Sequence, residues 1–146
     1  MDEIWIGEGG RVWDDRGSVA FNEQFKFDSV KRFYTVTNHR RGFVRAWHGH
    51  ATESKWVTVV RGAAMIGMVE IDNWHQPSKD LVPFTFVLTE YRPQMLHIPP
   101  GCANGFKTLT EDAVLLFFSS MTAVESRMDD YRYDARYWDV WQENER

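Results

Sequence analysis

The chain has 146 residues and a formal net charge of −4 at pH 7, and its length suits a single domain with one core. The acidic balance disfavours a nucleic-acid-binding protein. The longest apolar run, residues 113–118, is far shorter than the roughly 20 residues of a membrane-spanning helix, so no membrane association is expected. The single cysteine, Cys102, excludes an internal disulfide framework and a cysteine-based zinc site.

Seven short apolar or alternating segments, rich in aromatic and β-branched residues, predict strands. They are residues 33–36, 43–47, 56–60, 64–71, 84–88, 95–98 and 114–118. Turn-forming clusters separate them, at residues 38–42, 72–80, 91–93, 99–105 and 110–112. Many short strands with regular turns indicate an all-β sandwich or barrel. Residues 123–131 are expected to form a short helix or turn, and the aromatic tail, residues 131–141, to pack against a sheet.

Charge is concentrated between residues 31 and 55, which carry six basic residues and one acidic residue. A local net charge of +5 in an acidic chain favours a small anionic ligand over a long polyanion, although a solvated charged face is the alternative. The acidic N-terminus, MDEIWIGEGG, lacks the long apolar stretch of a secretory signal. Together with the single cysteine, this leads us to expect a cytoplasmic protein.

Two histidines, His48 and His50, stand two residues apart in the segment that follows Gly42. Side chains alternate along a strand, so both imidazoles are expected on the same face. Two imidazoles inside a barrel can bind a metal ion or supply a base for proton transfer. The spacing alone leaves both possibilities open.

This segment resembles the first motif of the cupins, in which a glycine, a His-x-His pair, a glutamate and a second glycine recur at fixed spacing. Gly42, His48, His50 and Gly62 match it, but Lys55 stands at the glutamate position. The second cupin motif is matched by Pro99 and Gly101, with Asn104 in place of its histidine. The lysine would repel a divalent ion, so no metal and no other cofactor is expected. Glu53 lies two residues before Lys55, on the same face of a strand, and could in principle replace the missing glutamate ligand.

Within the cupins, the chain resembles the dTDP-4-dehydrorhamnose 3,5-epimerases over residues 11–141. Four segments carry the likeness in order: residues 14–17, residues 42–48 with Lys55, residues 98–106, and Asp134 followed by Trp141. The His-x-His pair is similar instead to that of the nucleotide-sugar 3,4-ketoisomerases. The resemblance implies one cupin jelly-roll domain over residues 1–146.

The epimerase resemblance also implies roles for individual residues. His48 would be the base that removes a proton next to a keto group, and Asp134 would orient it, with Asp130 as a rival. Arg45 and Lys55 would bind the enolate and the diphosphate. Arg16 would be a further phosphate ligand, with the option of reaching into a partner subunit's site.

The remaining two site residues follow less directly from the family pattern. Asn104 occupies the position of the metal-binding histidine in the second cupin motif, and it is expected to bind substrate instead. His50 would be a second proton carrier or a sugar ligand. Arg45 lies three residues before His48, so it needs a bulge in the strand to face the same side.

The chain departs from the family at its catalytic tyrosine, whose position is taken by Phe117. Candidates to replace that hydroxyl are Ser119, Tyr131, Tyr133 and Tyr137. Because no hydroxyl stands at position 117, double epimerisation is the activity that this departure weakens most.

We therefore expect a homodimeric, metal-independent epimerase or isomerase of a nucleoside-diphosphate 4-keto-6-deoxysugar, linked to dTDP or GDP. Its product would supply surface polysaccharide or a glycosylated natural product. Three alternatives stay open: a 3,4-ketoisomerase, a metal-dependent cupin such as a dioxygenase, and a non-catalytic cupin that binds sugar nucleotides.

Overall fold

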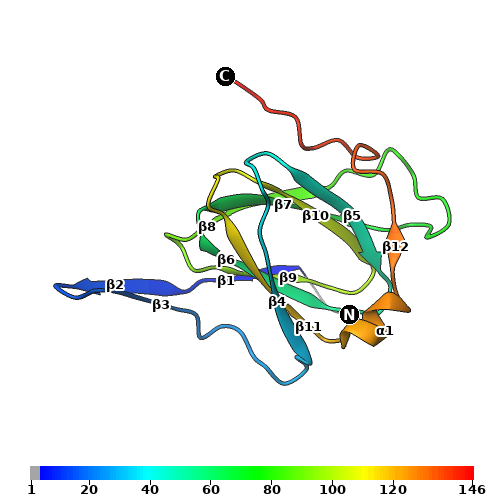
Figure 1. Cartoon of the computed structure of the whole chain (residues 1–146). Helices are drawn as coiled ribbons and strands as arrows, with labels where there is room; N and C mark the ends of the chain where they lie inside the picture. The colour runs from blue at the N-terminus through cyan, green and yellow to red at the C-terminus, as the bar shows by residue number, and fades with distance from the viewer. Residues whose placement is uncertain (1–3) are drawn as a thin grey trace.

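The structure is a computed structural model that describes residues 4–146; residues 1–3, the start of the expected domain, lie outside the described part of the chain. Two five-stranded antiparallel sheets pack face to face, and a two-stranded hairpin projects away from them (Figure 1). The all-β prediction is therefore confirmed.

The first sheet has the order β1-β9-β6-β11-β4, and the second has the order β12-β5-β10-β7-β8. The strands of the first sheet are β1 (Trp5–Gly7), β9 (Met95–Ile98), β6 (Lys55–Arg61), β11 (Val114–Ser119) and β4 (Arg32–Val36). Those of the second are β12 (Tyr131–Arg132), β5 (Val44–His50), β10 (Cys102–Thr108), β7 (Ala63–Glu70) and β8 (Phe84–Thr89). The hairpin pairs β2 (Gly10–Asp14) with β3 (Gly17–Phe21), and the helix α1 spans Ala123–Arg127.

The main core lies between the two sheets, where side chains such as Val57 and Leu115 of the first meet Ile66 of the second. The aromatic tail packs on the outer face of the second sheet, as predicted. Trp138 and Trp141 contact Trp47 of β5 there, with ring centroids 5.5 and 5.2 Å apart. Burial of these rings fixes the chain beyond β12 against the strand that carries the paired histidines.

The prediction of a turn over residues 99–105 is wrong beyond residue 101, because β10 begins at Cys102. This strand is hydrogen-bonded to β5 on one side and β7 on the other, and all of its residues are buried. Pairing along both edges outweighs the low strand propensity of Asn104 and Gly105. The predicted helix, by contrast, is confirmed but short.

The helix α1 begins at a capping box in which Thr122 and Glu125 bind each other's backbone N–H groups. It buries none of its residues, and Met128 already forms its C-cap. Within the described residues, no helix has the length and apolar character that crossing a membrane requires.

Candidate active site

Two adjoining cavities open beside β4, β5 and β6, one of about 270 Å³ and one of about 160 Å³. Both are lined by Tyr34, His48 and Lys55. The larger is lined in addition by Arg32, His50, Ala123, Ser126, Arg127, Asp130 and Arg132. The smaller is lined in addition by Val36, Arg45, Asn104, Phe106 and Phe117. The structure thus brings five of the seven predicted site residues together: His48, His50, Arg45, Lys55 and Asn104.

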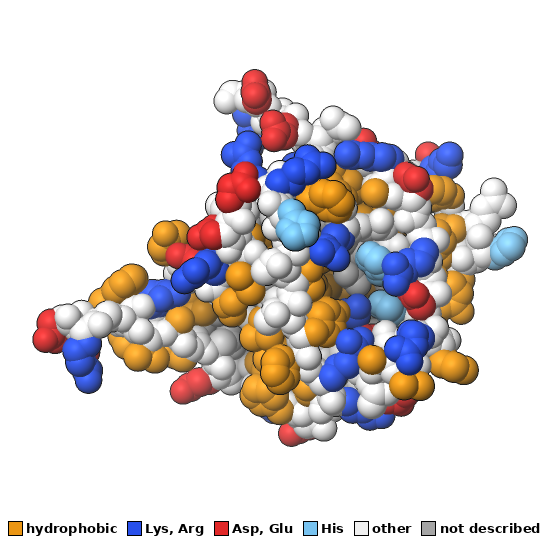
Figure 2. All heavy atoms as spheres, viewed as in Figure 1, with side chains coloured by type: hydrophobic (Ala, Val, Ile, Leu, Met, Phe, Trp, Pro, Cys, Tyr) orange, Lys and Arg blue, Asp and Glu red, His pale blue; other side chains and the backbone are white. Residues whose placement is uncertain are grey.

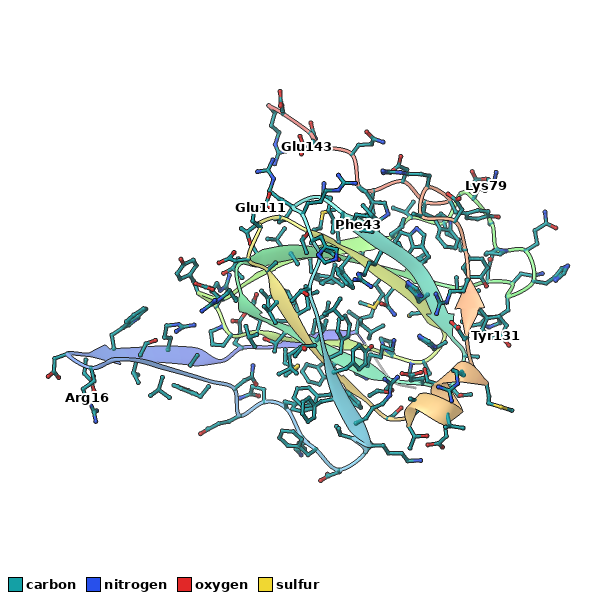
Figure 3. All side chains as sticks on the ribbon, viewed as in Figure 1. Arg16, Phe43, Lys79, Glu111, Tyr131 and Glu143 are labelled. Carbon is teal, nitrogen blue, oxygen red and sulfur yellow. The ribbon has the colours of Figure 1, made fainter. Side chains whose placement is uncertain are left out.

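The strand β5 places His48 and His50 on one face because a single residue, Gly49, separates them. Gly49 points to the opposite face, where a side-chain Cβ would come within 2.8 Å of the Trp74 ring. The absence of a side chain lets Trp74 and Tyr131 pack directly on the back of the strand; Tyr131 is labelled in Figure 3. This packing holds β5 from behind while both imidazoles line the larger cavity.

Arg45 reaches the same side as His48 because the pairing of β5 with β10 shifts register. Asn104 pairs with His48 and Phe106 with Arg45, so three steps along β5 face two along β10. This is the bulge that the sequence analysis required. The Arg45 guanidinium is then fixed by the side-chain oxygen of Asn38 at 2.8 Å and the Thr37 carbonyl at 3.1 Å.

Lys55 lies at the boundary of the two cavities, against a pair of stacked rings. Tyr34 and Phe117 are cross-strand neighbours whose centroids lie 5.1 Å apart at an interplanar angle of 6°. The Lys55 Nζ lies 5.6 Å from the first ring centroid and 5.9 Å from the second. An ammonium group in this position is stabilised by the faces of both rings and lies within reach of a ligand in either cavity.

His48 is poised as a neutral base. Burial, followed by the positive charges of Arg132 and Lys55, lowers the pKa of His48 to about 4. At pH 7 the ring is therefore uncharged and can accept a proton. A ligand anion would offset the charge of the arginine and the lysine, and so would raise this pKa on binding.

His50 is held in one tautomer by the backbone. Its Nδ1–H donates to the Asp129 carbonyl at 2.7 Å, which leaves the lone pair on Nε2. The Nε2 atom is buried and has no hydrogen-bond partner among the described residues, although the ring lines the larger cavity. Burial and Lys55 lower the pKa of His50, so this second imidazole is also neutral and has a free acceptor.

Glu53, the candidate substitute for a cupin metal ligand, is buried and lines neither cavity. Its two carboxylate oxygens accept hydrogen bonds of 2.6 Å from Ser119 and Ser126. Across residues 4–146, no group of three or more His, Cys, Asp or Glu side chains is placed to hold a metal ion.

The structure does not bring Asp134 to the site. Its carboxylate accepts a hydrogen bond from the Arg136 backbone N–H in an exposed turn, because the tail beyond β12 follows the outer face of the second sheet. The rival carboxylate, Asp130, lines the larger cavity and lies 2.9 Å from the Nε of Arg132. The placement therefore favours Asp130 as the acid near His48.

Arg16 lies at the end of the projecting hairpin, far from the cavities (Figure 3). Its side chain is 85% exposed and forms an ion pair with Asp14. Within this one chain, Arg16 therefore takes no part in the site.

Three of the hydroxyl groups considered in place of the missing tyrosine are committed elsewhere. The Tyr133 hydroxyl donates to the Trp74 carbonyl, the Tyr137 hydroxyl to the Pro77 carbonyl, and the Ser119 hydroxyl to Glu53. Tyr131 packs against Trp74 on the back of β5. Tyr34 of β4 is a tyrosine that does line both cavities. Sequence reasoning missed it because the family's catalytic tyrosine aligns with Phe117, which lies on a different strand, β11.

Sequence reasoning did not name three arginines of the larger cavity as site residues: Arg32, Arg127 and Arg132. Figure 2 shows basic and histidine side chains gathered around a hollow on the face toward the viewer. The positive segment 31–55 pointed to Arg32, but Arg127 and Arg132 enter only because α1 and β12 fold back beside β5. The cavity suits an anionic ligand.

The comparisons with known proteins agree with this picture. The family model of dTDP-4-dehydrorhamnose 3,5-epimerase matches residues 1–138. A curated relative, the "Probable low-salt glycan biosynthesis epimerase Agl13" of Haloferax volcanii, is 28% identical over 95 residues. That match covers 64% of this chain and 58% of the relative, so it spans less than two thirds of the relative's length.

Solved structures share the fold at low sequence identity. The rmlC epimerase of Mycobacterium tuberculosis matches with a TM-score of 0.75 and 17% identity, over 94% of this chain and 72% of its own. ChmJ, a 3'-monoepimerase from Streptomyces bikiniensis in complex with dTDP-quinovose, gives 0.73 and 20%, over 90% and 69%. The QdtA 3,4-ketoisomerase of Thermoanaerobacterium thermosaccharolyticum, in complex with TDP, gives 0.69 and 21%, over 93% and 92%.

These neighbours confirm the predicted cupin jelly roll, and the family match confirms the resemblance drawn from the four sequence segments. The chain belongs to the dTDP-4-dehydrorhamnose 3,5-epimerase family.

Proposed function

We propose that this protein is a metal-independent epimerase or isomerase that moves a proton next to the keto group of a nucleoside-diphosphate 4-keto-6-deoxysugar. The observation that carries the proposal is the neutral His48 imidazole, which lines both cavities beside the Lys55 ammonium group. Family membership supports the same reaction class.

The chemistry requires both a base and fixed positive charge. A carbon acid next to a ketone is too weak for an imidazole to ionise quickly unless the enolate oxygen is stabilised as it forms. His48 takes the proton as a neutral imidazole, and Lys55 and Arg45 stabilise the enolate or bind the diphosphate. Binding of the anionic substrate raises the pKa of His48 toward neutrality, which is the best range for a base working at pH 7.

A second proton donor is needed to complete either reaction. Epimerisation returns a proton to the same carbon from the opposite face, and the lining residue best suited to that is Tyr34, since Phe117 has no hydroxyl. Asp130 takes the place of Asp134 as the carboxylate near the base, and Asn104 forms part of the sugar-binding wall of the smaller cavity.

The alternative reaction is 3,4-ketoisomerisation, and the free Nε2 of His50 favours it. In that reaction removal of the C3 proton leaves an enediolate, and its O4 gains a proton to give the enediol. The C3 hydroxyl then loses its proton as C4 gains one, which leaves the ketone at C3. Two neutral imidazoles on one strand face can share these transfers. A cupin that binds sugar nucleotides without turnover is the remaining alternative.

The nucleotide is dTDP in preference to GDP, because ChmJ and QdtA are described with dTDP, dTDP-quinovose or TDP bound. The protein acts as a homodimer in which the projecting hairpin lies against a second copy and carries Arg16 toward that copy's ligand. The single buried thiol, Cys102, suits the cytoplasm, and the relative from Haloferax volcanii supports a role in glycan biosynthesis.

The experiment that tests the proposal is solvent exchange. Incubated in heavy water with dTDP-4-keto-6-deoxyglucose, the protein should introduce deuterium at one carbon next to the ketone, and a chelator should not slow it. A deuterated sugar with inverted configuration identifies an epimerase, and a 3-keto sugar identifies the ketoisomerase. Tight dTDP binding with no exchange would identify the non-catalytic cupin, and loss of exchange on chelation would refute metal independence.

A further inference from the structure

Glu53 is a buried acid that lines neither cavity, with only 1% of the residue exposed. Its Oε2 accepts a hydrogen bond from the Ser119 hydroxyl and its Oε1 one from the Ser126 hydroxyl, each at 2.6 Å. Bonds of this length are typical of a hydroxyl donating to an ionised carboxylate. A buried charge is costly unless it is paired, so the surroundings of Glu53 must supply positive charge as well.

That positive charge comes from the wall of the larger cavity. The Arg32 guanidinium lies 3.4 Å and the Lys55 Nζ 4.0 Å from Oε2, while the Nδ1 of the neutral His50 ring lies 3.4 Å from Oε1. All three side chains line the larger cavity, and so does Ser126 of α1. One carboxylate behind the wall therefore contacts cavity side chains from β4, β5, β6 and α1.

The position of Glu53 is itself fixed by the segment that follows α1. The Asp129 carboxylate accepts hydrogen bonds from the backbone N–H groups of Ala51, Thr52 and Glu53. Burial acts to raise the pKa of Asp129, but these bonds outweigh it and keep that pKa low. The turn that carries Glu53 and the segment that carries Ser126 thus hold each other in place through two carboxylates.

We propose that Glu53 is a positioning residue of this site, which holds Lys55 and His50 in the geometry that proton transfer requires. The same carboxylate ties that geometry to α1, which forms one side of the cavity. The inference rests on the proposed function and deepens it, because it names a carboxylate that lies behind the wall of the larger cavity.

Two physical effects would follow from the loss of this negative charge. The cations of Lys55 and Arg32 would repel each other and any imidazolium that forms at His50. The basicity of His50 would also fall, because Glu53 and Asp129 act to raise its pKa while burial and Lys55 lower it. The other charged or titratable groups of the cavity are Tyr34, His48, Arg127, Asp130 and Arg132.

The test is the variant Glu53→Gln, which keeps the size of the side chain and removes its charge. We expect deuterium exchange to fall by about 10- to 100-fold, since displacement of catalytic groups by about 1 Å has effects of that size. The Kd for dTDP should change by less than about threefold, because Glu53 lines neither cavity and Glu53→Gln leaves the charge of Lys55 in place. The pKa of His50, followed by NMR of its ring, should move further down.

A matched control is Glu125→Gln on the exposed side of α1, where the acid pairs with Lys31 at 3.1 Å. Glutamine preserves the capping box, so exchange and the titration of His50 should stay as in the wild type. Exchange within twofold of wild type in Glu53→Gln, with an unchanged His50 titration, would overturn the proposal. Equal losses of exchange and dTDP affinity would overturn it too, since they indicate a general structural role.

If Glu53→Gln does not fold, Ser119→Ala decides the question, because it releases one carboxylate oxygen while keeping the charge. A measurable loss of exchange with dTDP affinity retained supports the proposal, and unchanged exchange overturns it. If the wild-type protein itself shows no exchange, the proposed function fails. The dTDP affinity and the His50 titration of the variants then still decide the role of Glu53.

Discussion

The cavity wall around His48 and the β2–β3 hairpin around Arg16 both match the same family pattern, yet their surroundings are opposite. In the cavity wall, Lys55 is 9% exposed and His50 5%, and each has several partners within the chain. On the hairpin, all of β3 is exposed, and Trp13 and Val19 leave 69% and 63% of their surface open.

The difference teaches that the chain completes one of these regions by itself and leaves the other unfinished. The Glu53 carboxylate joins side chains of β4, β5, β6 and α1 by contacts within the chain, so one chain forms this region by itself. The exposed apolar side chains of the hairpin are the kind of surface that another protein surface covers. We therefore expect changes in the wall to act within one chain, and changes in the hairpin to act through a second copy.

The largest effect is expected from the base. His48→Asn should keep the fold and the affinity for dTDP but slow deuterium exchange by roughly 10²–10⁴, the usual contribution of a general base. Rates of exchange measured by NMR on wild type and variant would check this. Exchange at the wild-type rate would mean that His50, rather than His48, removes the proton.

A smaller effect is expected from the cations. Lys55→Ala and Arg45→Ala should each weaken dTDP binding by about 10- to 100-fold, the value of a charge-assisted hydrogen bond to an anion. Lys79→Ala, at an exposed lysine that lies over the Tyr137 ring on the tail side, is the control and should leave the affinity unchanged. Calorimetry with dTDP separates these outcomes, and unchanged affinity in both variants would place the diphosphate elsewhere.

The strands of the sandwich were largely predictable, because alternation of apolar residues is a local signal. The segment 95–98 matches β9 in full, and most others differ from the observed strands by one to three residues at an end. The strand β10 was not predictable in this way, since Asn104 and Gly105 carry turn propensity and are held extended by pairing on both sides. The hairpin β2–β3, whose strands are mostly exposed, has little apolar periodicity to detect.

The site was predictable where the motif and the strand coincide, and not where distant segments meet. The parity argument for His48 and His50, and the bulge required for Arg45, follow from the period of a strand. Arg132 and Asp130 join the site only through the return of the chain along β5, which no spacing encodes. Asp134 matches the family motif but lies outside the site. A motif match does not show that the chain at Asp134 follows the outer face of the second sheet.

The pH dependence of stability tests a third property of the cavity wall, the low pKa of His48. The pKa of His48 is about 4 in the fold and near 6.5 when unfolded, so the unfolded state binds more protons between these values. Stability is thus fully present above about pH 6.5 and is lost as the pH falls toward 4, by about 2 kcal/mol or less since the ring is partly exposed. Urea unfolding at pH 7 and pH 5 should show a smaller loss for His48→Asn than for wild type, and equal losses would contradict the pKa.

The smallest effect, and the one that tests the comparison itself, is expected at the hairpin. Arg16→Ala should weaken dTDP binding by no more than about fivefold, because a charge–charge contact made by an exposed side chain contributes little. That loss should appear only while two copies are associated.

Trp13→Ser combined with Val19→Ser should shift the protein toward the monomer in analytical ultracentrifugation, because it removes exposed apolar surface that a second copy would cover. In this monomeric background Arg16→Ala should have no further effect on dTDP affinity, since no second copy then receives the hairpin. A monomeric wild-type protein, or an Arg16 effect that persists in the monomer, would show that the hairpin acts within its own chain, and the contrast between the two regions would then be one of exposure alone.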